Sequence, residues 1–146
     1  MVAYHDTMSE AVHLALVKGE LKPDTPPLVR VHLRDDLCDL LGAQREGCGW
    51  PLDDVMGRIG AEGGVLLLLR PQQDDKALVR RIKEYQLRDQ GVKMEQHEAS
   101  DDLRTYGAGA QILVDLGISR MRVMSAPNRL HALSGFGLEV VDYVHE

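Results

Sequence analysis

Apolar and polar residues alternate in two segments of the first third of the chain. In Val12–Lys18 and in Leu28–Leu33, apolar side chains recur at every second position, which is the period of a strand that buries one face. The prolines within residues 22–27 favour a turn between the two segments. His13 and His32 fall inside the predicted strands, where a histidine is more often a packed or solvated side chain than a ligand.

A third apolar segment shows no alternation. Residues 65–69 read Val-Leu-Leu-Leu-Leu, after two glycines and before Arg70 and Pro71. A short continuous apolar run between turn residues is typical of a strand that is buried on both faces. We therefore expect this strand at the centre of a sheet.

Helical spacing of apolar residues occurs in residues 52–59, 77–87 and 103–116. Gly91 stands at the usual stop position after the second of these helices. Ser100, with the two aspartates that follow it, offers capping oxygens for the third. The prediction is completed by a strand at 121–124, a helix begun by Pro127 and a last strand at 138–144.

The order of these elements predicts an α/β fold. Strands that alternate with helices in the second half predict parallel crossover connections, and the strand-rich first third predicts antiparallel pairing at one side. We expect a three-layer α/β/α domain with a mixed sheet, formed by the whole chain as a single domain. The apolar helix faces are predicted as core rather than interface, at Leu78, Ile82, Tyr85, Ile112 and Leu113.

Charge and composition narrow the choice of partners. The formal net charge of -6 argues against nucleic-acid and membrane binding, because both favour a basic surface that releases counterions. No apolar run has the length of a membrane span. The two cysteines, Cys38 and Cys48, fit a reducing cytoplasmic setting, which favours free thiols over a disulfide.

Two longer segments have a more particular order of residues. They are 83–91 (KEYQLRDQG) and 102–117 (DLRTYGAGAQILVDLG), and they follow the shorter motifs 30–32 (RVH) and 64–70 (GVLLLLR). Together these motifs make nearly the whole chain resemble GTP cyclohydrolase II. The resemblance implies a GTP cyclohydrolase II-like fold, a homodimer and a role in riboflavin biosynthesis. Members of that family open the guanine ring of GTP with a zinc-bound water and release formate and pyrophosphate.

The zinc ligands of the family are three cysteines in the spacing C-x10-C-x-C. By resemblance they fall on Asp35, Glu46 and Cys48, while Cys38 matches a glycine of the family pattern. Because zinc needs several well-placed ligands, we expect a dismantled site that holds no metal. Two alternatives stay open at this point, a polar turn with a buried thiol and a site of two carboxylates and one thiolate.

The residues that act on the substrate in the family are only partly present. Asp74 stands where the family has an arginine that contacts the substrate, and a carboxylate there would repel phosphate. Met94 stands near a threonine of the pattern. Asp102 and Arg104 match a catalytic pair, a proton acceptor and a nucleophilic arginine. As a structural alternative, Asp102 caps or begins a helix and Arg104 is a solvated or ion-paired side chain.

Three further residues match ligand-binding positions by resemblance. Arg30 corresponds to an arginine of the substrate site, and Ser125 and Arg129 lie near a threonine and a lysine that contact phosphate. The last two are predicted on a strand-to-helix turn, where backbone N–H groups favour an anion. The ligand that these residues would hold is a nucleotide or a phosphate. The structural alternatives are a salt bridge at Arg30 and a helix cap by Ser125.

The departures from the family pattern favour a catalytically degenerate GTP cyclohydrolase II-like domain of riboflavin biosynthesis, with a structural or regulatory role. One alternative is an active cyclohydrolase with an altered metal site, and another is a regulatory domain that binds a nucleotide or phosphate. Domains of this family are often fused behind a 3,4-dihydroxy-2-butanone-4-phosphate synthase. We therefore expect a piece of a longer cytoplasmic chain, with that synthase domain as its partner.

Overall fold

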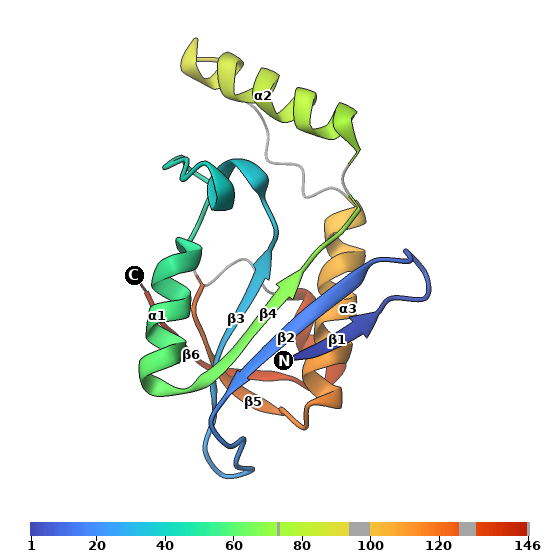
Figure 1. The fold of residues 1–146 in the computed structure, drawn as a ribbon, viewed down its shortest axis with the longest axis vertical. Helices are drawn as coiled ribbons and strands as arrows, with labels where there is room; N and C mark the ends of the chain where they lie inside the picture. Colours follow the sequence, from blue (N-terminus) through green and yellow to red (C-terminus); the bar gives the residue numbers. More distant parts are fainter. Residues whose placement is uncertain (73, 94–99, 126–130, 146) are drawn as a thin grey trace.

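The computed structural model describes residues 1–72, 74–93, 100–125 and 131–145. Within these residues, six strands form one sheet in the order β1-β2-β4-β3-β5-β6 (Figure 1). The strands are β1 (Val2–His5), β2 (Val12–Lys18), β3 (Leu28–Leu33), β4 (Gly64–Leu69), β5 (Arg120–Val123) and β6 (Glu139–Tyr143). The helices are α1 (Leu52–Glu62), α2 (Asp75–Asp89) and α3 (Ser100–Asp115), with a short π-helix η1 (Asp36–Leu40) and a 3-10 helix η2 (His131–Phe136).

The pairing of the strands changes from antiparallel to parallel at β4. β1 pairs antiparallel with β2, and β2 pairs antiparallel with β4. β3 pairs parallel with both β4 and β5, and β5 pairs parallel with β6. The predicted α/β class with a mixed sheet is confirmed, and β4 has the central position that its continuous apolar run predicted.

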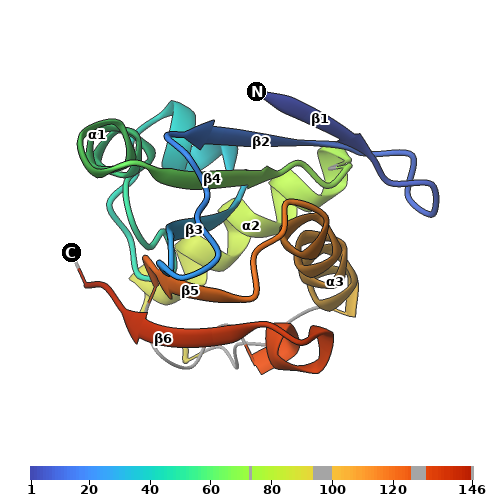
Figure 2. The same cartoon turned by 90° about the horizontal axis from the view of Figure 1, so that it is seen from below.

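Helices cover both faces of the sheet, as Figure 2 shows. Successive residues of a strand point to opposite faces, so Leu66 and Leu67 enter different cores. Leu66 packs in a cluster with Val55 and Ile59 of α1, whereas Leu67 packs in a cluster with Leu113 of α3. The domain therefore has the three-layer α/β/α arrangement that the sequence predicts.

Gly64 lets β4 begin close beside β3. Its φ of 138° lies in the region that favours glycine, and a Cβ at this position would collide with the carbonyl oxygen of Leu28. The parallel pairing of the two strands starts one residue later, where Val29 lies opposite Val65. Any side chain at Gly64 would push the strands apart where their pairing begins.

Two details of the fold differ from the prediction, and a third cannot be compared with the structure. β3 is mainly buried instead of half-buried, because it has a strand on each side and a helix layer on each face. α2 has no buried residue, although the spacing of Leu78, Ile82 and Tyr85 predicted a core face. α2 instead lies beyond the carboxyl end of the sheet, outside its layers (Figure 1). Pro127, the predicted start of a helix, is outside the described residues.

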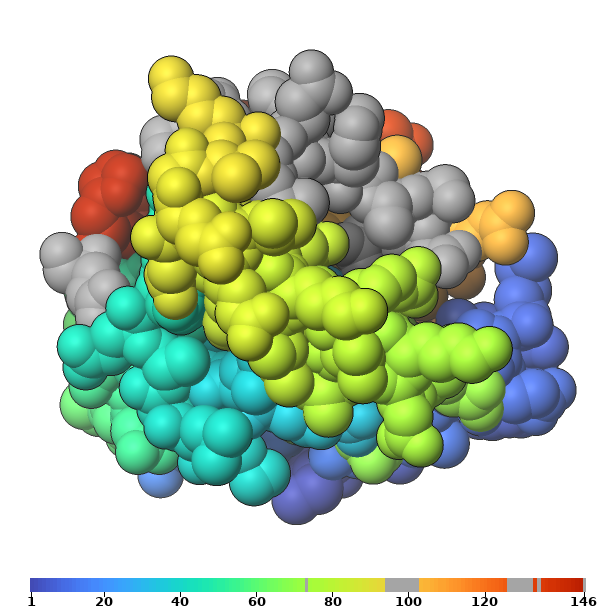
Figure 3. Space-filling view, turned by 90° about the horizontal axis from the view of Figure 1, so that it is seen from above, coloured from blue at the N-terminus to red at the C-terminus, as the bar shows by residue number. Residues whose placement is uncertain are grey.

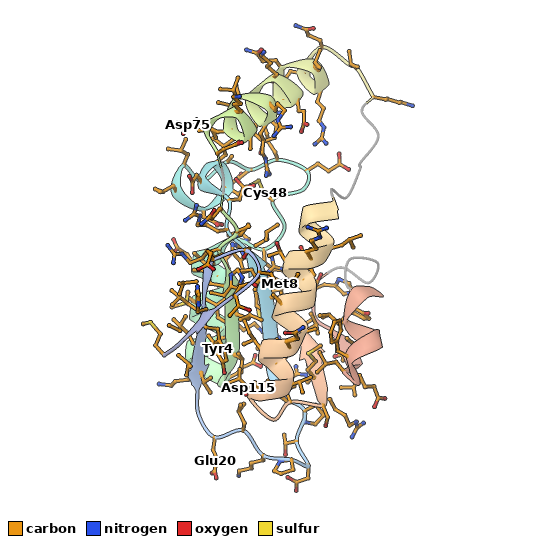
Figure 4. The ribbon with its side chains drawn as sticks, turned by 90° about the vertical axis from the view of Figure 1, so that its right-hand side faces the viewer. Tyr4, Met8, Glu20, Cys48, Asp75 and Asp115 are labelled. Atoms are coloured by element: carbon orange, nitrogen blue, oxygen red, sulfur yellow. A yellow bond between two sulfur atoms is a disulfide. The ribbon has the colours of Figure 1, made fainter. Side chains whose placement is uncertain are left out.

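One edge of the sheet is tied to the helix layer by a polar contact. The hydroxyl group of Tyr4 in β1 donates a hydrogen bond to Oδ2 of Asp115 at the end of α3, over 2.8 Å (Figure 4). This bond connects the edge strand to the helix that covers the larger core. In the described part of the chain, no helix is long and apolar enough to cross a membrane.

Candidate functional site

Polar side chains gather at the carboxyl ends of the parallel strands, between the sheet and α2. β3 contributes Arg30 and His32, and the loop that follows it contributes Asp35 and Asp39. Ser125 comes shortly after the end of β5. In α/β sheets, ligands bind in the crevice outside the carboxyl ends of the parallel strands. This edge is therefore the candidate functional site.

Arg30 extends from β3 to the end of β5. Its Nη1 donates a hydrogen bond to the carbonyl oxygen of Met124 over 2.7 Å, and its Nε lies 3.4 Å from Nδ1 of His32. Ser125, the residue after Met124, is buried. The structure thus brings the guanidinium of Arg30 to the end of β5, where Ser125, a second predicted ligand residue, follows Met124. Their role in ligand binding stays a prediction.

His32 is buried and bound by a carboxylate. Its Nε2 lies 2.8 Å from Oδ1 of Asp39, whose Oδ2 accepts the backbone N–H of Asp35 over 2.9 Å. Burial lowers the pKa of His32, and the positive charge of Arg30 adds to this, against the opposing effect of Asp39. Neutral His32 therefore donates from Nε2 to Asp39 and keeps Nδ1 as an acceptor toward Arg30.

Asp35, the first of the positions that the resemblance assigns to zinc thiolates, is the N-cap of η1. Its Oδ1 accepts the backbone N–H groups of Leu37 over 3.0 Å and of Cys38 over 3.2 Å. Its Oδ2 forms an ion pair with Arg81 of α2. Both oxygens of the Asp35 carboxylate are therefore engaged by the protein itself.

Cys38 and Cys48 form a disulfide, with their Cα atoms 5.6 Å apart. The expectation of free thiols was wrong, because it rested on the cellular compartment and not on the distance between the two residues. The loop between them turns back on itself and brings Cys48 against η1. The available signal in the sequence was weak: two cysteines separated by a glycine-containing loop of suitable length.

The side chains at the three thiolate positions do not fit a zinc site. Sγ of Cys48 is bonded to Cys38, the carboxylate of Asp35 is bound by Arg81, and Glu46 is exposed to solvent. Among the described residues, no group of three or more histidine, cysteine or acidic side chains is arranged to hold a metal ion. That the protein lacks zinc in solution stays a prediction.

Arg45 connects the second half of the loop to α2. Its Nη2 lies 2.7 Å and 3.0 Å from the two carboxylate oxygens of Asp89, and its guanidinium lies over the ring of Tyr85, 4.3 Å from the centroid. The hydrogen bonds lower the pKa of Asp89 and raise the pKa of Arg45. Figure 3 shows α2 lying across the loop. Sequence reasoning missed Arg45 and Arg81, because their partners lie more than forty residues away and no local motif marks them.

The other predicted site residues lie in or near α3 or outside the described residues. Asp102 and Arg104 lie in the first turns of α3, and the side chain of Arg104 is exposed. Arg129 and Met94 are outside the described residues. The assignment of Asp102 and Arg104 as a catalytic pair stays a prediction.

Sequence comparison places this fold and this site in a family. The sequence pattern of GTP cyclohydrolase II matches residues 1–145, and the chain therefore belongs to the GTP cyclohydrolase II family. Its relatives include proteins that carry the name riboflavin biosynthesis protein RibBA. The chain is thus a GTP cyclohydrolase II-like domain of the kind found in riboflavin biosynthesis proteins.

Three relatives illustrate how much of each protein is shared. A 3,4-dihydroxy-2-butanone 4-phosphate synthase of Photobacterium phosphoreum is 40% identical over 145 residues, which are 99% of this chain and 38% of that protein. A protein of the same name from Pseudomonas aeruginosa has the same identity and coverage. The riboflavin biosynthesis protein RibBA of Chlorobium phaeovibrioides is 39% identical over 150 residues, 99% of this chain and 37% of that protein. The chain spans little more than a third of the length of these relatives.

Proposed function

We propose that this domain is a catalytically degenerate GTP cyclohydrolase II domain that acts as a structural or regulatory module in riboflavin biosynthesis. The observation that carries the proposal is that two of the three side chains at the thiolate positions are already bound within the protein. Zinc chemistry of the family type needs side chains that are free to bind the ion. Here Cys48 is in a disulfide, and Asp35 is bound by Arg81 and by the backbone of η1.

A second observation supports the proposal at the substrate-binding loop. Asp74, at the position of a family arginine, is the N-cap of α2, where its Oδ1 accepts the N–H of Ala77 over 2.7 Å. A carboxylate repels a phosphate, whereas an arginine would pair with it. The Asp74 side chain therefore stabilises the start of a helix in place of a contact to the triphosphate.

Assembly and location complete the proposal. We expect a 3,4-dihydroxy-2-butanone-4-phosphate synthase domain in the same polypeptide, because relatives of that name match this chain over 38% of their length. The family resemblance also leads us to expect a homodimer and a cytoplasmic location. Light scattering of the purified protein tests the homodimer, since a single species with the molar mass of one chain would contradict it.

Formate release tests the degenerate assignment directly. The purified protein is supplied with zinc and GTP, and we expect no more formate than in a metal-stripped control. Zinc is counted in the same preparation by atomic spectroscopy, with an expected content far below one ion per chain. Turnover of GTP that depends on a stoichiometric metal would overturn the proposal and favour an active cyclohydrolase with an altered metal site.

A matched variant tests whether the residues at the three thiolate positions are the reason for the low zinc content that we expect. The triple change Asp35→Cys, Cys38→Gly and Glu46→Cys restores the family spacing of three cysteines and removes the disulfide partner of Cys48. We expect this variant to bind zinc where the parent protein does not, because thiolates then stand at all three positions. Equal zinc contents in the two proteins would contradict the role given to these positions.

A second candidate function is the binding of a nucleotide or phosphate as a regulatory ligand. It is favoured by Arg30, whose guanidinium reaches the end of β5 next to the buried Ser125, since a guanidinium suits phosphate recognition. Calorimetry with GTP, FMN and ribulose 5-phosphate should then give heat that is reduced in Arg30→Gln and unchanged in Arg58→Gln on α1. No heat at millimolar ligand would leave only the structural role.

A further inference from the structure

The disulfide joins two halves of the loop that follows β3. The first limb is residues 36–40, which form η1 and contain Cys38, and the second limb is residues 45–49, which contain Cys48. Figure 4 shows Cys48 between the end of the sheet and α2. A covalent bond between the limbs therefore lies at the candidate functional site and not at the periphery of the domain.

Both limbs also hold α2. Arg81, in the middle of α2, forms an ion pair with Asp35, directly before the first limb, and approaches Cys38 within it. Arg45 of the second limb binds Asp89 at the end of α2 and lies over the ring of Tyr85, one turn after Arg81. α2 has no buried residue of its own. The position of α2 over the sheet thus depends on contacts to two limbs that the disulfide keeps together.

The second limb also lies against the arginine of the candidate ligand site. A Cβ built at Gly49 would lie 3.3 Å from Nη2 of Arg30, so the backbone next to Cys48 is in contact range of the guanidinium. Movement of the second limb would change the surroundings of Arg30 and the hydrogen bond that Arg30 donates to Met124. The disulfide and the site are therefore mechanically coupled.

We propose that the Cys38–Cys48 disulfide is a redox switch of this site. In the oxidised protein the two limbs and α2 are clamped over the ends of β3 and β5. Reduction by two equivalents of a cellular thiol breaks the S–S bond, yields two cysteine thiols and one oxidised disulfide of the reductant, and releases the limbs from each other. The site then opens beside Arg30.

The surroundings of the two sulfur atoms suit thiol exchange. Both cysteines are partly exposed to solvent, so a small thiol can reach them. Nη2 of Arg81 lies 4.0 Å from Sγ of Cys38, where its positive charge stabilises the thiolate that leaves when a reductant attacks Cys48. Disulfides are rare in cytosolic proteins and, where they occur in mesophiles, are usually transient and catalytic or redox-sensing; the cytoplasmic location proposed above therefore favours a reversible bond.

This inference does not rest on whether the domain turns over GTP. An active, a degenerate and a ligand-binding domain would each contain the same loop and the same pair of sulfur atoms. The test therefore measures thiols and loop structure and needs neither formate nor nucleotide. A disulfide that resists glutathione would overturn the switch and leave the proposed function standing, whereas two free thiols in the air-oxidised protein would also remove the disulfide that supports the proposed function.

The experiment is a redox titration of the full chain with reduced and oxidised glutathione, without denaturant. Alkylation followed by mass spectrometry counts the free thiols, and Trp50 reports the loop, because it is the single tryptophan, follows the second limb directly and is buried. On reduction by millimolar glutathione we expect two alkylated cysteines, a change in Trp50 emission, and amide exchange in residues 36–49 that is at least about tenfold faster.

Two variants serve as controls. Cys38→Ser with Cys48→Ser should show the fast exchange of the reduced form under all conditions, while Gln44→Ser in the same loop should respond like the parent protein. The switch is overturned if the air-oxidised protein carries two free thiols, or if the disulfide resists millimolar glutathione. It is equally overturned if the two sulfurs are reduced while loop exchange and Trp50 emission stay the same.

Discussion

Apolar residues recur at helical spacing in both α2 and α3, which predicts that each helix packs on the sheet. Only α3 packs there. Leu113 of α3 is fully buried, and Gly109 lets the helix approach β4 so closely that a Cβ would lie 3.2 Å from Cδ1 of Leu69. α2 is attached through Arg81 and Arg45. It contains no glycine and carries several long basic side chains.

The two helices are therefore stabilised by different forces. Burial of a leucine side chain contributes about 1.5–3 kcal/mol to the free energy of unfolding, whereas an exposed ion pair contributes about 0–1 kcal/mol. α3 should thus unfold only with the whole core, and α2 should open locally at a smaller free energy. Helical periodicity therefore predicts a helix but not the surface that it covers.

The largest expected effect is the loss of a leucine from α3. Leu113→Ala should lower the free energy of unfolding by about 2–5 kcal/mol, because it leaves a cavity in the core. The matched change in α2 is Ile82→Ala, at a side chain that is 43% exposed, and it should cost less than about 1 kcal/mol. Urea unfolding followed by circular dichroism measures both values.

Equal losses in the two variants would show that α2 is packed as firmly as α3. In particular, a loss of several kcal/mol at Ile82 would mean that α2 is covered in solution by a second molecule. Dependence of that loss on protein concentration would then identify the covering molecule as another copy of the chain.

Low pH is expected to have an intermediate effect on the free energy of unfolding. Burial lowers the pKa of His32 and of His13 below the ordinary value of 6.5, so the unfolded chain binds protons that the folded chain does not. The free energy of unfolding should therefore fall as the pH drops below about 6.5 toward the lowered values. Arg30, Asp39 and Asp35 face His32; burial, helped by the charge of Arg30, outweighs the two carboxylates, which raise the pKa.

His32→Gln isolates the contribution of His32 to this loss of stability, since glutamine keeps a hydrogen-bond donor for Asp39 without a titrating group. Urea unfolding at about pH 8 and about pH 5 should show a smaller loss of stability in the variant than in the parent protein. Parallel pH profiles for the two proteins would contradict the lowered pKa, because they would mean that His32 binds its proton equally well in the folded and the unfolded chain.

The smallest expected effect concerns the attachment of α2. Arg81→Gln removes the ion pair with Asp35 and should lower the global free energy of unfolding by no more than about 1 kcal/mol. Amide exchange within α2 should nevertheless become faster, because the helix loses one of its contacts to the loop. Arg80→Gln, one position away, is the control and should leave the exchange unchanged, whereas equal effects would remove the special role of Arg81.

Much of the fold follows from local pattern. The strands β2 and β3 begin and end where the alternation predicts, and the apolar run before Arg70 lies in the central strand β4. Burial is less predictable: β3 reads as half-buried but has neighbours on every side. In the candidate site, the positions of Asp35 and Cys48 were predicted by resemblance, while their actual partners, Arg81 and Cys38, were not.

The strand and helix segments, the mixed α/β class and the family can be predicted from the amino-acid order, because periodicity, glycine positions and long motifs are local properties of the chain. The exposure of α2, the ion pair between Asp35 and Arg81 and the bond between Cys38 and Cys48 cannot be predicted in this way. These contacts depend on the path of the loop through space. No local pattern carries the distance between two residues that the loop brings together.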